Sequence, residues 1–333
     1  MINSGISPII IGTGSYVPEK VMTNFDLEKI VDTTNDWIFE RSGILERRIA
    51  RDDETTSDMA AEASRRALAD ANVDATDIDL VILTSATGDM HFPSTACLLQ
   101  AKLGLRTNIP CFDLSAACTG FIYALEVAGR MMQSGFYKKV LIASAEKMSA
   151  ILDWQDRNTC VLFGDGAGAV VLKAEIGELS GVIGSVLGAD GTGMDILNMP
   201  AGGSAMPSSE QTVKDRLHYV KMDGKEVFKM AVKTMQEKAF EVCELCNINP
   251  EQISLLIPHQ ANSRIIKSVA KRLKIPSEKI FENLEKYGNT SSATIPIALD
   301  EARKQGRIKE NDYVLFVAFG AGLTWGATLI KWK

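Results

Sequence analysis

The feature that most constrains the fold is the alternation of short apolar runs with longer helical patterns along all 333 residues. Apolar runs of about four to eight residues, bounded by glycine and polar residues, are typical of buried strands. Apolar residues spaced three and four apart are typical of helices that cover such strands. The alternation therefore predicts a layered α/β architecture. The expected strands are 8–17, 80–87, 109–116, 139–146, 168–175, 181–190, 254–261, 313–320 and 326–332, and the expected helices include 56–71 and 226–243.

The chain also contains a faint internal repeat. Segments in the first part of the chain resemble segments in the second part, and they occur in the same order. The similar pairs are 73–86 with 248–261, 138–146 with 311–320, and 164–172 with 320–329. We therefore expect two similar α/β halves, residues 1–178 and 179–333. The glycine clusters at 12–18 and 164–169 lack the strand–glycine–helix order of a dinucleotide site, so we expect tight turns there.

The overall composition excludes several functional classes. The net charge of −6 does not favour binding to nucleic acid, so any anionic partner must contact a local basic patch. No apolar run approaches the roughly 20 residues of a membrane helix. The opening MINSGISPII lacks the basic and apolar regions of a signal peptide. We expect a cytoplasmic protein that contacts neither nucleic acid nor a membrane.

The six cysteines do not form a disulfide framework in a chain of this size. Cys243 and Cys246 share one face of an expected helix with no second pair nearby, which favours packing over zinc. Cys118, in DLSAACTGF, lies where a strand ends and an apolar helix begins. A thiol there faces the positive end of the helix dipole, which lowers its pKa and favours a nucleophilic thiolate. A small buried cysteine is the alternative.

Two further segments favour the nucleophile. IPHQANSRI places His259 immediately after a buried strand, and YGNTSSATIP places Asn289 in a polar turn before a helix. A cysteine, a histidine and an asparagine in loops at strand ends form a constellation for nucleophilic catalysis. Taken singly, Asn289 is more typical of a turn or a helix cap.

These three segments together resemble the β-ketoacyl-[acyl-carrier-protein] synthase III family, the condensing enzymes that start type II fatty acid synthesis. The similarity extends from about residue 8 to the C-terminus. It includes TNDWIFERSGILERRIA at 34–50, FGDGAGAVVL at 163–172, DGKEVFKMA at 223–231 and FGAGLTWGATL at 319–329. The resemblance implies a thiolase-like fold with five layers (αβαβα), made of two similar α/β halves, and a homodimer.

The resemblance also implies a catalytic triad of Cys118, His259 and Asn289 and a ping-pong reaction without a metal or redox cofactor. Cys118 takes a short acyl group from acyl-CoA, with acetyl-CoA the default primer. His259 and Asn289 donate hydrogen bonds to the thioester oxygen of malonyl-acyl carrier protein, where enolate charge develops as CO₂ leaves. The carbanion attacks the acyl group and gives a β-ketoacyl product. Elongating synthases (Cys-His-His) and thiolases (two cysteines and a histidine) do not match the asparagine in GNTS.

Binding roles follow from the same resemblance. The oxyanion hole is assigned to the backbone N–H groups of Cys118 and Ala321. The family usually has three glycines where this chain has Gly320-Ala321-Gly322, so we expect a negative φ at Ala321. Phe92 matches a position that reaches into the partner subunit's acyl pocket, and Phe319 walls the tunnel. The residues implied for coenzyme A are Trp37 and Arg157 around adenine, Arg41 at a phosphate, and Gly224, Phe228 and Asn262 along the pantetheine arm.

Basic side chains on two helices are candidates for docking an acidic acyl carrier protein, because a local basic rim steers such a partner despite the net charge. The alternative is a set of solvated surface charges. The candidates are Lys225 and Lys229 on one helix, and Arg264, Lys267 and Lys271 on the other.

Two other functions stay open at this level. One is a same-fold condensing enzyme of secondary metabolism with a different acyl donor or acceptor, and the other is a non-catalytic homologue that only binds acyl chains or carrier protein. The primer preference is not readable, because separate loops form the acyl pocket; the segment 195–213 is a candidate to shape it.

Overall fold

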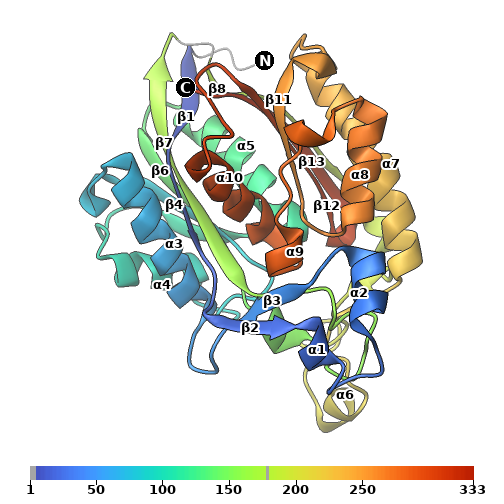
Figure 1. Ribbon diagram of the computed structural model, residues 1–333. Helices are drawn as coiled ribbons and strands as arrows, with labels where there is room; N and C mark the ends of the chain where they lie inside the picture. The colour runs from blue at the N-terminus through green and yellow to red at the C-terminus, as the bar shows by residue number, and fades with distance from the viewer. Residues whose placement is uncertain (1–4, 178–179) are drawn as a thin grey trace.

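The computed structural model describes residues 5–177 and 180–333 and contains two β-sheets that face each other across a layer of helices (Figure 1). The first sheet has the order β1 (Ile6–Tyr16), β7 (Gly166–Ile176), β6 (Lys139–Glu146), β4 (Leu80–Thr84) and β5 (Cys111–Leu114). The second has the order β11 (Ile253–Pro258), β12 (Tyr313–Gly320), β13 (Thr324–Lys331) and β8 (Gly181–Ala189). Each of the nine predicted strands is present.

The two sheets share one pairing pattern. In the first sheet β4 pairs in parallel with β6, whereas β6–β7 and β7–β1 are antiparallel. In the second sheet β11 pairs in parallel with β12, whereas β12–β13 and β13–β8 are antiparallel. The segments that resemble one another in sequence therefore occupy equivalent strands. The predicted boundary between the halves, at residues 178 and 179, lies outside the described residues.

The helices complete a five-layer α/β fold, as predicted (Figure 1). Helices α3 (Thr56–Ala71) and α4 (Thr95–Leu103) cover the outer face of the first sheet. Helices α7 (Gly224–Leu245) and α8 (Ser263–Leu273) cover the outer face of the second. The central layer holds α5 (Gly120–Met132) and α10 (Thr294–Lys304), whose apolar side chains form one core with both sheets.

Local sequence signals set the helix ends. Thr55 and Asp58 form a reciprocal capping box at the start of α3, and Asn72 ends that helix with a left-handed φ of 50°. None of the helices in the described parts of the chain has the length and apolarity needed to cross a membrane. The remaining elements are β2 (Lys20–Thr23), α1 (Asn24–Leu27), α2 (Asn35–Ser42), β3 (Glu46–Ile49), β9 (Leu197–Asn198), α6 (Glu210–Lys214), β10 (Lys221–Met222) and α9 (Leu284–Tyr287).

Two sequence predictions concern packing, and one of them is wrong. The glycine clusters do not form tight turns: Gly14 lies within β1 and Gly168 within β7. A Cβ at Gly14 would collide with the Ala63 carbonyl of α3, and one at Gly168 would lie 2.7 Å from the Pro296 Cβ of α10. These glycines let helices approach the first sheet closely. The predicted packing role of the CxxC pair is confirmed, because Cys243 is buried and Cys246 packs on the core beneath α7.

Candidate active site

The Cys118 thiol lies between a strand and a helix, as the sequence predicts. A 3₁₀ turn, Ala117–Thr119, carries it from β5 to the start of α5. The predicted low pKa is wrong: burial, together with the charge of the nearby Glu146, raises the pKa of the thiol to about 12. A hydrogen bond from Sγ to the Ser291 hydroxyl, 3.6 Å long, acts in the opposite direction. The loss of contact with water has a larger effect on the thiol pKa than this hydrogen bond does.

His259 follows β11 and is held by its backbone, whose N–H donates to the Val317 carbonyl at 2.8 Å. Burial lowers the pKa of its imidazole to about 3, so the ring is neutral at physiological pH. Nδ1 lies 2.7 Å from the Thr294 hydroxyl. We assign Thr294 as the donor in this bond, which places the ring proton on Nε2. A neutral histidine in this tautomer offers one N–H donor at Nε2.

Asn289 is fixed at three points. Its backbone N–H donates to the Leu162 carbonyl at 2.9 Å, and its carbonyl accepts from Gly164 at 3.1 Å. Its side-chain Oδ1 accepts from the backbone N–H of Ser291 at 2.8 Å. Because the amide oxygen is engaged, the Nδ2 group is the part of the side chain that donates to a ligand.

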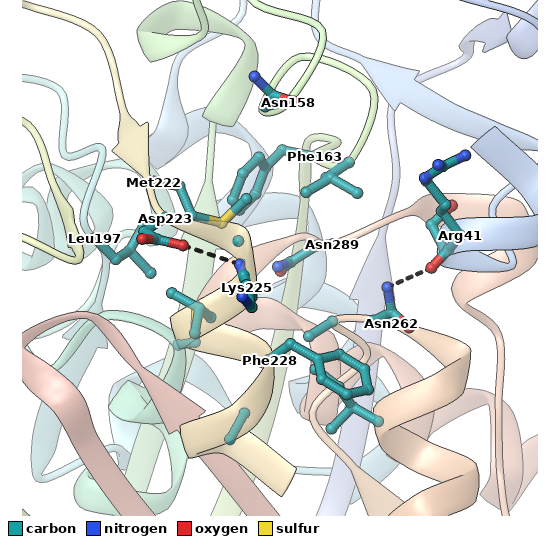
Figure 2. Close-up of a pocket in the computed structure, with 18 of the residues that line it drawn as sticks. Arg41, Asn158, Phe163, Leu197, Met222, Asp223, Lys225, Phe228, Asn262 and Asn289 are labelled. Carbon is teal, nitrogen blue, oxygen red and sulfur yellow. Dashed lines mark hydrogen bonds between the residues drawn. The ribbon is translucent and has the colours of Figure 1, made fainter. Parts of the chain in front are cut away.

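Cys118, His259 and Asn289 come from three separate loops and line one cavity of about 1000 Å³. Asn289 lies deep in this cavity, behind Lys225 at its mouth (Figure 2). Phe319, at the end of β12, is a further part of the wall. The three predicted catalytic residues therefore converge, although 171 positions separate the first from the last in sequence, which is 289 minus 118.

The glycine loop after β12 packs directly on the nucleophile. A Cβ at Gly320 would lie 2.9 Å from the backbone nitrogen of Cys118 and 3.2 Å from its Cβ. Gly320 has an extended backbone, so the close approach, not its dihedral angles, requires glycine there. The residues with positive φ in this turn are Gly322 and Leu323. Ala321 has a negative φ, as expected for an alanine in this position.

The predicted coenzyme A residues gather at the mouth of the cavity. Trp37, Gly224, Phe228 and Asn262 line it together with Arg41. The Asn262 side-chain amide donates to the Arg41 carbonyl at 2.8 Å (Figure 2).

Arg157 is not among the residues that line the cavity. Its guanidinium lies 5.1 Å from the centre of the Trp37 ring and donates to the Asp32 carbonyl at 2.9 Å. The Arg41 guanidinium is 4.5 Å from the same ring centre. Trp37 therefore contacts both of the arginines with which the sequence associates it.

The other predicted residues are dispersed. Phe92 lies outside the cavity lining with 84% of its surface exposed. Among the basic candidates, Lys225 and Arg264 line the mouth, and the Arg264 guanidinium lies 5.4 Å from the centre of the Phe228 ring. Three others are exposed farther out: Lys229, Lys267 and Lys271.

Sequence reasoning missed the polar residues behind the cavity. Ser291 and Thr294 lie within the segment that singled out Asn289, and each contacts one of the other two candidate residues. Glu146 ends a predicted strand and is fully buried. A carboxylate at the end of an apolar strand is a signal that could have found it.

Two sheets with the same strand pairing, and a buried Cys, His and Asn around one cavity between them, define a condensing enzyme of the thiolase-like fold. Comparisons with known proteins identify the family. Residues 112–191 match the family model described as 3-oxoacyl-[acyl-carrier-protein (ACP)] synthase III, and residues 243–332 match its C-terminal model. The chain belongs to this family and is an acyltransferase.

Similar proteins cover almost the whole chain. A β-ketoacyl-[acyl-carrier-protein] synthase III of Caldanaerobacter subterraneus is 56% identical over 97% of both chains. The protein of the same name from Fusobacterium nucleatum is 50% identical over 96% of this chain and 97% of its own. The crystal structure of 3-oxoacyl-[acyl-carrier-protein] synthase III from Aquifex aeolicus is 49% identical, with a TM-score of 0.90 over 98% of this chain and 100% of that one.

Proposed function

We propose that this chain condenses a short acyl group from acyl-CoA with malonyl-acyl carrier protein and carries the acyl group on Cys118. The products are a β-ketoacyl-acyl carrier protein, CoA and CO₂. The observation that carries the proposal is the convergence of Cys118, His259 and Asn289 on one cavity whose mouth holds Trp37 and Arg41. The family relationship favours this reaction over a secondary-metabolic variant.

In the first half-reaction the sulfur of Cys118 attacks the thioester carbon of acyl-CoA. The resulting oxyanion accepts hydrogen bonds from the backbone N–H groups of Cys118 and Ala321, and collapse releases the CoA thiolate. The close packing of Gly320 on Cys118 supports this assignment, because it brings the two backbone segments together. Acetyl-CoA is the primer we propose by default.

In the second half-reaction malonyl-acyl carrier protein occupies the same cavity. The Nε2–H of His259 and the Nδ2–H of Asn289 donate to its thioester oxygen, which stabilises the enolate that forms as CO₂ leaves. The carbanion then attacks the acyl carbon on Cys118 and displaces its sulfur. A neutral His259 suits this role, since a neutral donor does not protonate the carbanion. These steps require no metal or redox cofactor.

The mouth of the cavity suits an acyl-CoA. Adenine stacks on Trp37, where Arg157 is the second contact, and Arg41 meets a phosphate. The pantetheine arm passes Gly224, Phe228 and Asn262 toward Cys118.

We also propose a cytoplasmic homodimer, made of two similar halves that meet near residue 178. The exposed ring of Phe92 supports the dimer, because a large aromatic side chain with 84% exposure is suited to burial in a partner subunit's acyl pocket beside its Phe319.

The basic side chains form the proposed dock for the acidic carrier protein. Lys225 and Arg264, at the mouth, contact the carrier closest to its thioester. The exposed outer residues extend the positive rim and steer the approach. They are Lys229, Lys267 and Lys271.

Separate measurement of the two half-reactions tests this proposal. Cys118→Ala abolishes acyl transfer from acetyl-CoA, read by mass spectrometry of the intact protein. His259→Ala and Asn289→Ala retain acylation of Cys118 and lose decarboxylation of malonyl-acyl carrier protein by about 10²–10³-fold, the usual cost of one enolate donor. Equal loss of both half-reactions in folded His259 and Asn289 variants refutes the division of roles.

A further inference from the structure

A buried carboxyl group joins two segments that are far apart in sequence. Glu146, the last residue of β6, is fully buried. Its Oε2 accepts from the Ser85 hydroxyl, the Ala86 N–H and the Thr87 hydroxyl at 3.2, 3.0 and 2.7 Å. Its Oε1 accepts from the hydroxyl and the backbone N–H of Ser292 at 2.7 and 3.4 Å. One carboxyl group therefore holds both the loop that follows β4 and the turn that precedes α10.

The turn that contains Ser292 also carries the contacts that orient the two proposed enolate donors. Just before it, the backbone N–H of Ser291 donates to Asn289 Oδ1 at 2.8 Å, which leaves the Nδ2 group to donate to a ligand. Just after it, the Thr294 hydroxyl bonds His259 Nδ1 at 2.7 Å. A shift of this turn would therefore change the direction of both donors.

The backbone of the turn is strained at Ser291, which has a left-handed φ of 51°. A non-glycine residue is about 5–30-fold less populated in this region than at an ordinary negative φ. Such a conformation persists only where the surrounding structure holds it. Two contacts do so here: Asn289 binds the N–H of Ser291, and Glu146 binds the next residue, Ser292.

Ser292 is also packed tightly against the helix that follows the nucleophile. Gly120 begins α5, two residues after Cys118, and a Cβ there would lie 3.3 Å from the Ser292 Cβ. The Ser292 hydroxyl has one proton and lies 2.7 Å from Glu146 but 3.3 Å from the Thr84 carbonyl, so the carboxyl group is its main acceptor. The bond to Glu146 therefore fixes the turn beside the segment that carries the thiol.

We propose that Glu146 is a positioning residue for the decarboxylation of malonyl-acyl carrier protein. By holding Ser292, it keeps Ser291 in the left-handed conformation. The Ser291 N–H then stays on Asn289 Oδ1, and the Nδ2 group is directed toward the thioester oxygen. Without this anchor Ser291 relaxes to a negative φ and releases the Asn289 amide. Acylation of Cys118 uses neither enolate donor and is largely retained.

The inference rests on the proposed function, because it assigns Asn289 to the enolate. Hydrogen exchange of the backbone amides in 289–294, followed by mass spectrometry, needs no substrate and therefore tests the anchor separately. If the wild-type protein does not decarboxylate malonyl-acyl carrier protein, the proposed function fails. Faster exchange of this turn in Ser292→Ala would still support the anchor, and unchanged exchange would overturn it.

The main experiment measures the two half-reactions in Ser292→Ala, which removes the hydroxyl that Glu146 holds. Decarboxylation should slow about 5–30-fold, because the left-handed conformer loses that much of its population. Cys118 acylation by acetyl-CoA should stay within a few-fold of wild type. Thr87→Val is the matched control, since it removes a hydroxyl bond of the same length, 2.7 Å, from the other oxygen of Glu146. It should leave decarboxylation within a few-fold of wild type.

Variants at position 291 test the conformational part of the proposal. Glycine adopts a positive φ without penalty and alanine does not, while both lack the serine hydroxyl. With Ser292 intact, Ser291→Gly and Ser291→Ala should decarboxylate at similar rates. Without the anchor, Ser291→Gly/Ser292→Ala should be faster than Ser291→Ala/Ser292→Ala by about 5–30-fold.

Three results overturn the proposal. Equal slowing of decarboxylation by Thr87→Val and Ser292→Ala means that Glu146 only supports the fold. Equal slowing of both half-reactions in folded Ser292→Ala means that the anchor does not act through the enolate donors. Equal rates of the two double variants mean that the conformation of Ser291 does not depend on Glu146. None of these variants replaces the buried Glu146 itself, so the test does not depend on whether the protein folds without this carboxyl group.

Discussion

Adding a single methyl group at Gly320 tests whether the backbone of the glycine loop serves the nucleophile. In Gly320→Ala the new Cβ would lie 2.9 Å from the backbone nitrogen of Cys118, 3.1 Å from the Thr324 hydroxyl and 3.2 Å from the Cys118 Cβ. The first contact is to backbone, so no flexible side chain can yield. The two segments must separate by a few tenths of an ångström.

The size of the effect follows from this separation. Overpacking of this kind costs about 1–3 kcal/mol of folding stability. The larger effect is on catalysis, because the methyl group lies against the N–H proposed to bind the oxyanion. Loss of one such donor lowers the rate about 10²–10³-fold. We expect Cys118 acylation by acetyl-CoA to fall by that factor in protein that is still folded.

Acyl-enzyme formation followed by mass spectrometry, with a thermal melt of the same samples, measures both quantities. Gly191→Ala is the matched control, because a Cβ at Gly191 meets no atom within 4 Å. It should leave acylation and melting temperature near wild type. Wild-type acylation by Gly320→Ala would refute the reasoning, and so would a stability loss with no kinetic effect.

Three further predictions concern the site and its mouth. Thr294→Val removes the hydroxyl that bonds His259 Nδ1 and should slow malonyl decarboxylation at least tenfold without slowing Cys118 acylation; equal slowing of both steps contradicts the tautomer assignment. Burial lowers the pKa of His259 from 6.5 to about 3, so between these pH values the unfolded state binds a proton that the folded state does not. The free energy of unfolding should therefore be highest above pH 6.5 and fall as the pH is lowered toward 3. Urea unfolding of His259→Gln should show a shallower loss over that interval, and an identical slope rules out this origin. Arg264→Glu should raise KM for malonyl-acyl carrier protein several-fold at low salt and less at high salt, with acylation by acetyl-CoA unchanged. An unchanged KM in this variant and in Lys229→Glu/Arg264→Glu refutes the dock.

Local pattern was sufficient to predict the elements of this fold. Strand β12 is an uninterrupted apolar run, and α3 carries its own capping box, so their boundaries follow from a few neighbouring residues. The internal similarity predicted that these runs occupy equivalent positions, and the shared pairing order agrees. The motifs around Cys118 and His259 could be recognised because each follows a strand, at the edge of a sheet where loops meet. Asn289 instead lies in a polar turn between α9 and the next helical turn, so the expectation of a strand end is wrong for this residue.

The tertiary structure alone decided what depends on contacts between distant segments. From sequence alone Gly14 and Gly168 are predicted to be turn residues. The structure shows instead that each allows a helix to pack closely on a strand. The position of Cys118 at a helix N-terminus predicts an activated thiol, yet burial raises its pKa. Desolvation depends on all the atoms that surround the thiol in space, and not only on its neighbours in sequence. Glu146 is 28 residues from Cys118, a difference of 146 minus 118, yet its charge contributes to the raised pKa of that thiol. Ser291, whose hydroxyl accepts a hydrogen bond from the thiol, comes from the far end of the chain. Sequence spacing carries no information on such proximity, because it is the packing of two sheets on a shared helical layer that brings these groups together.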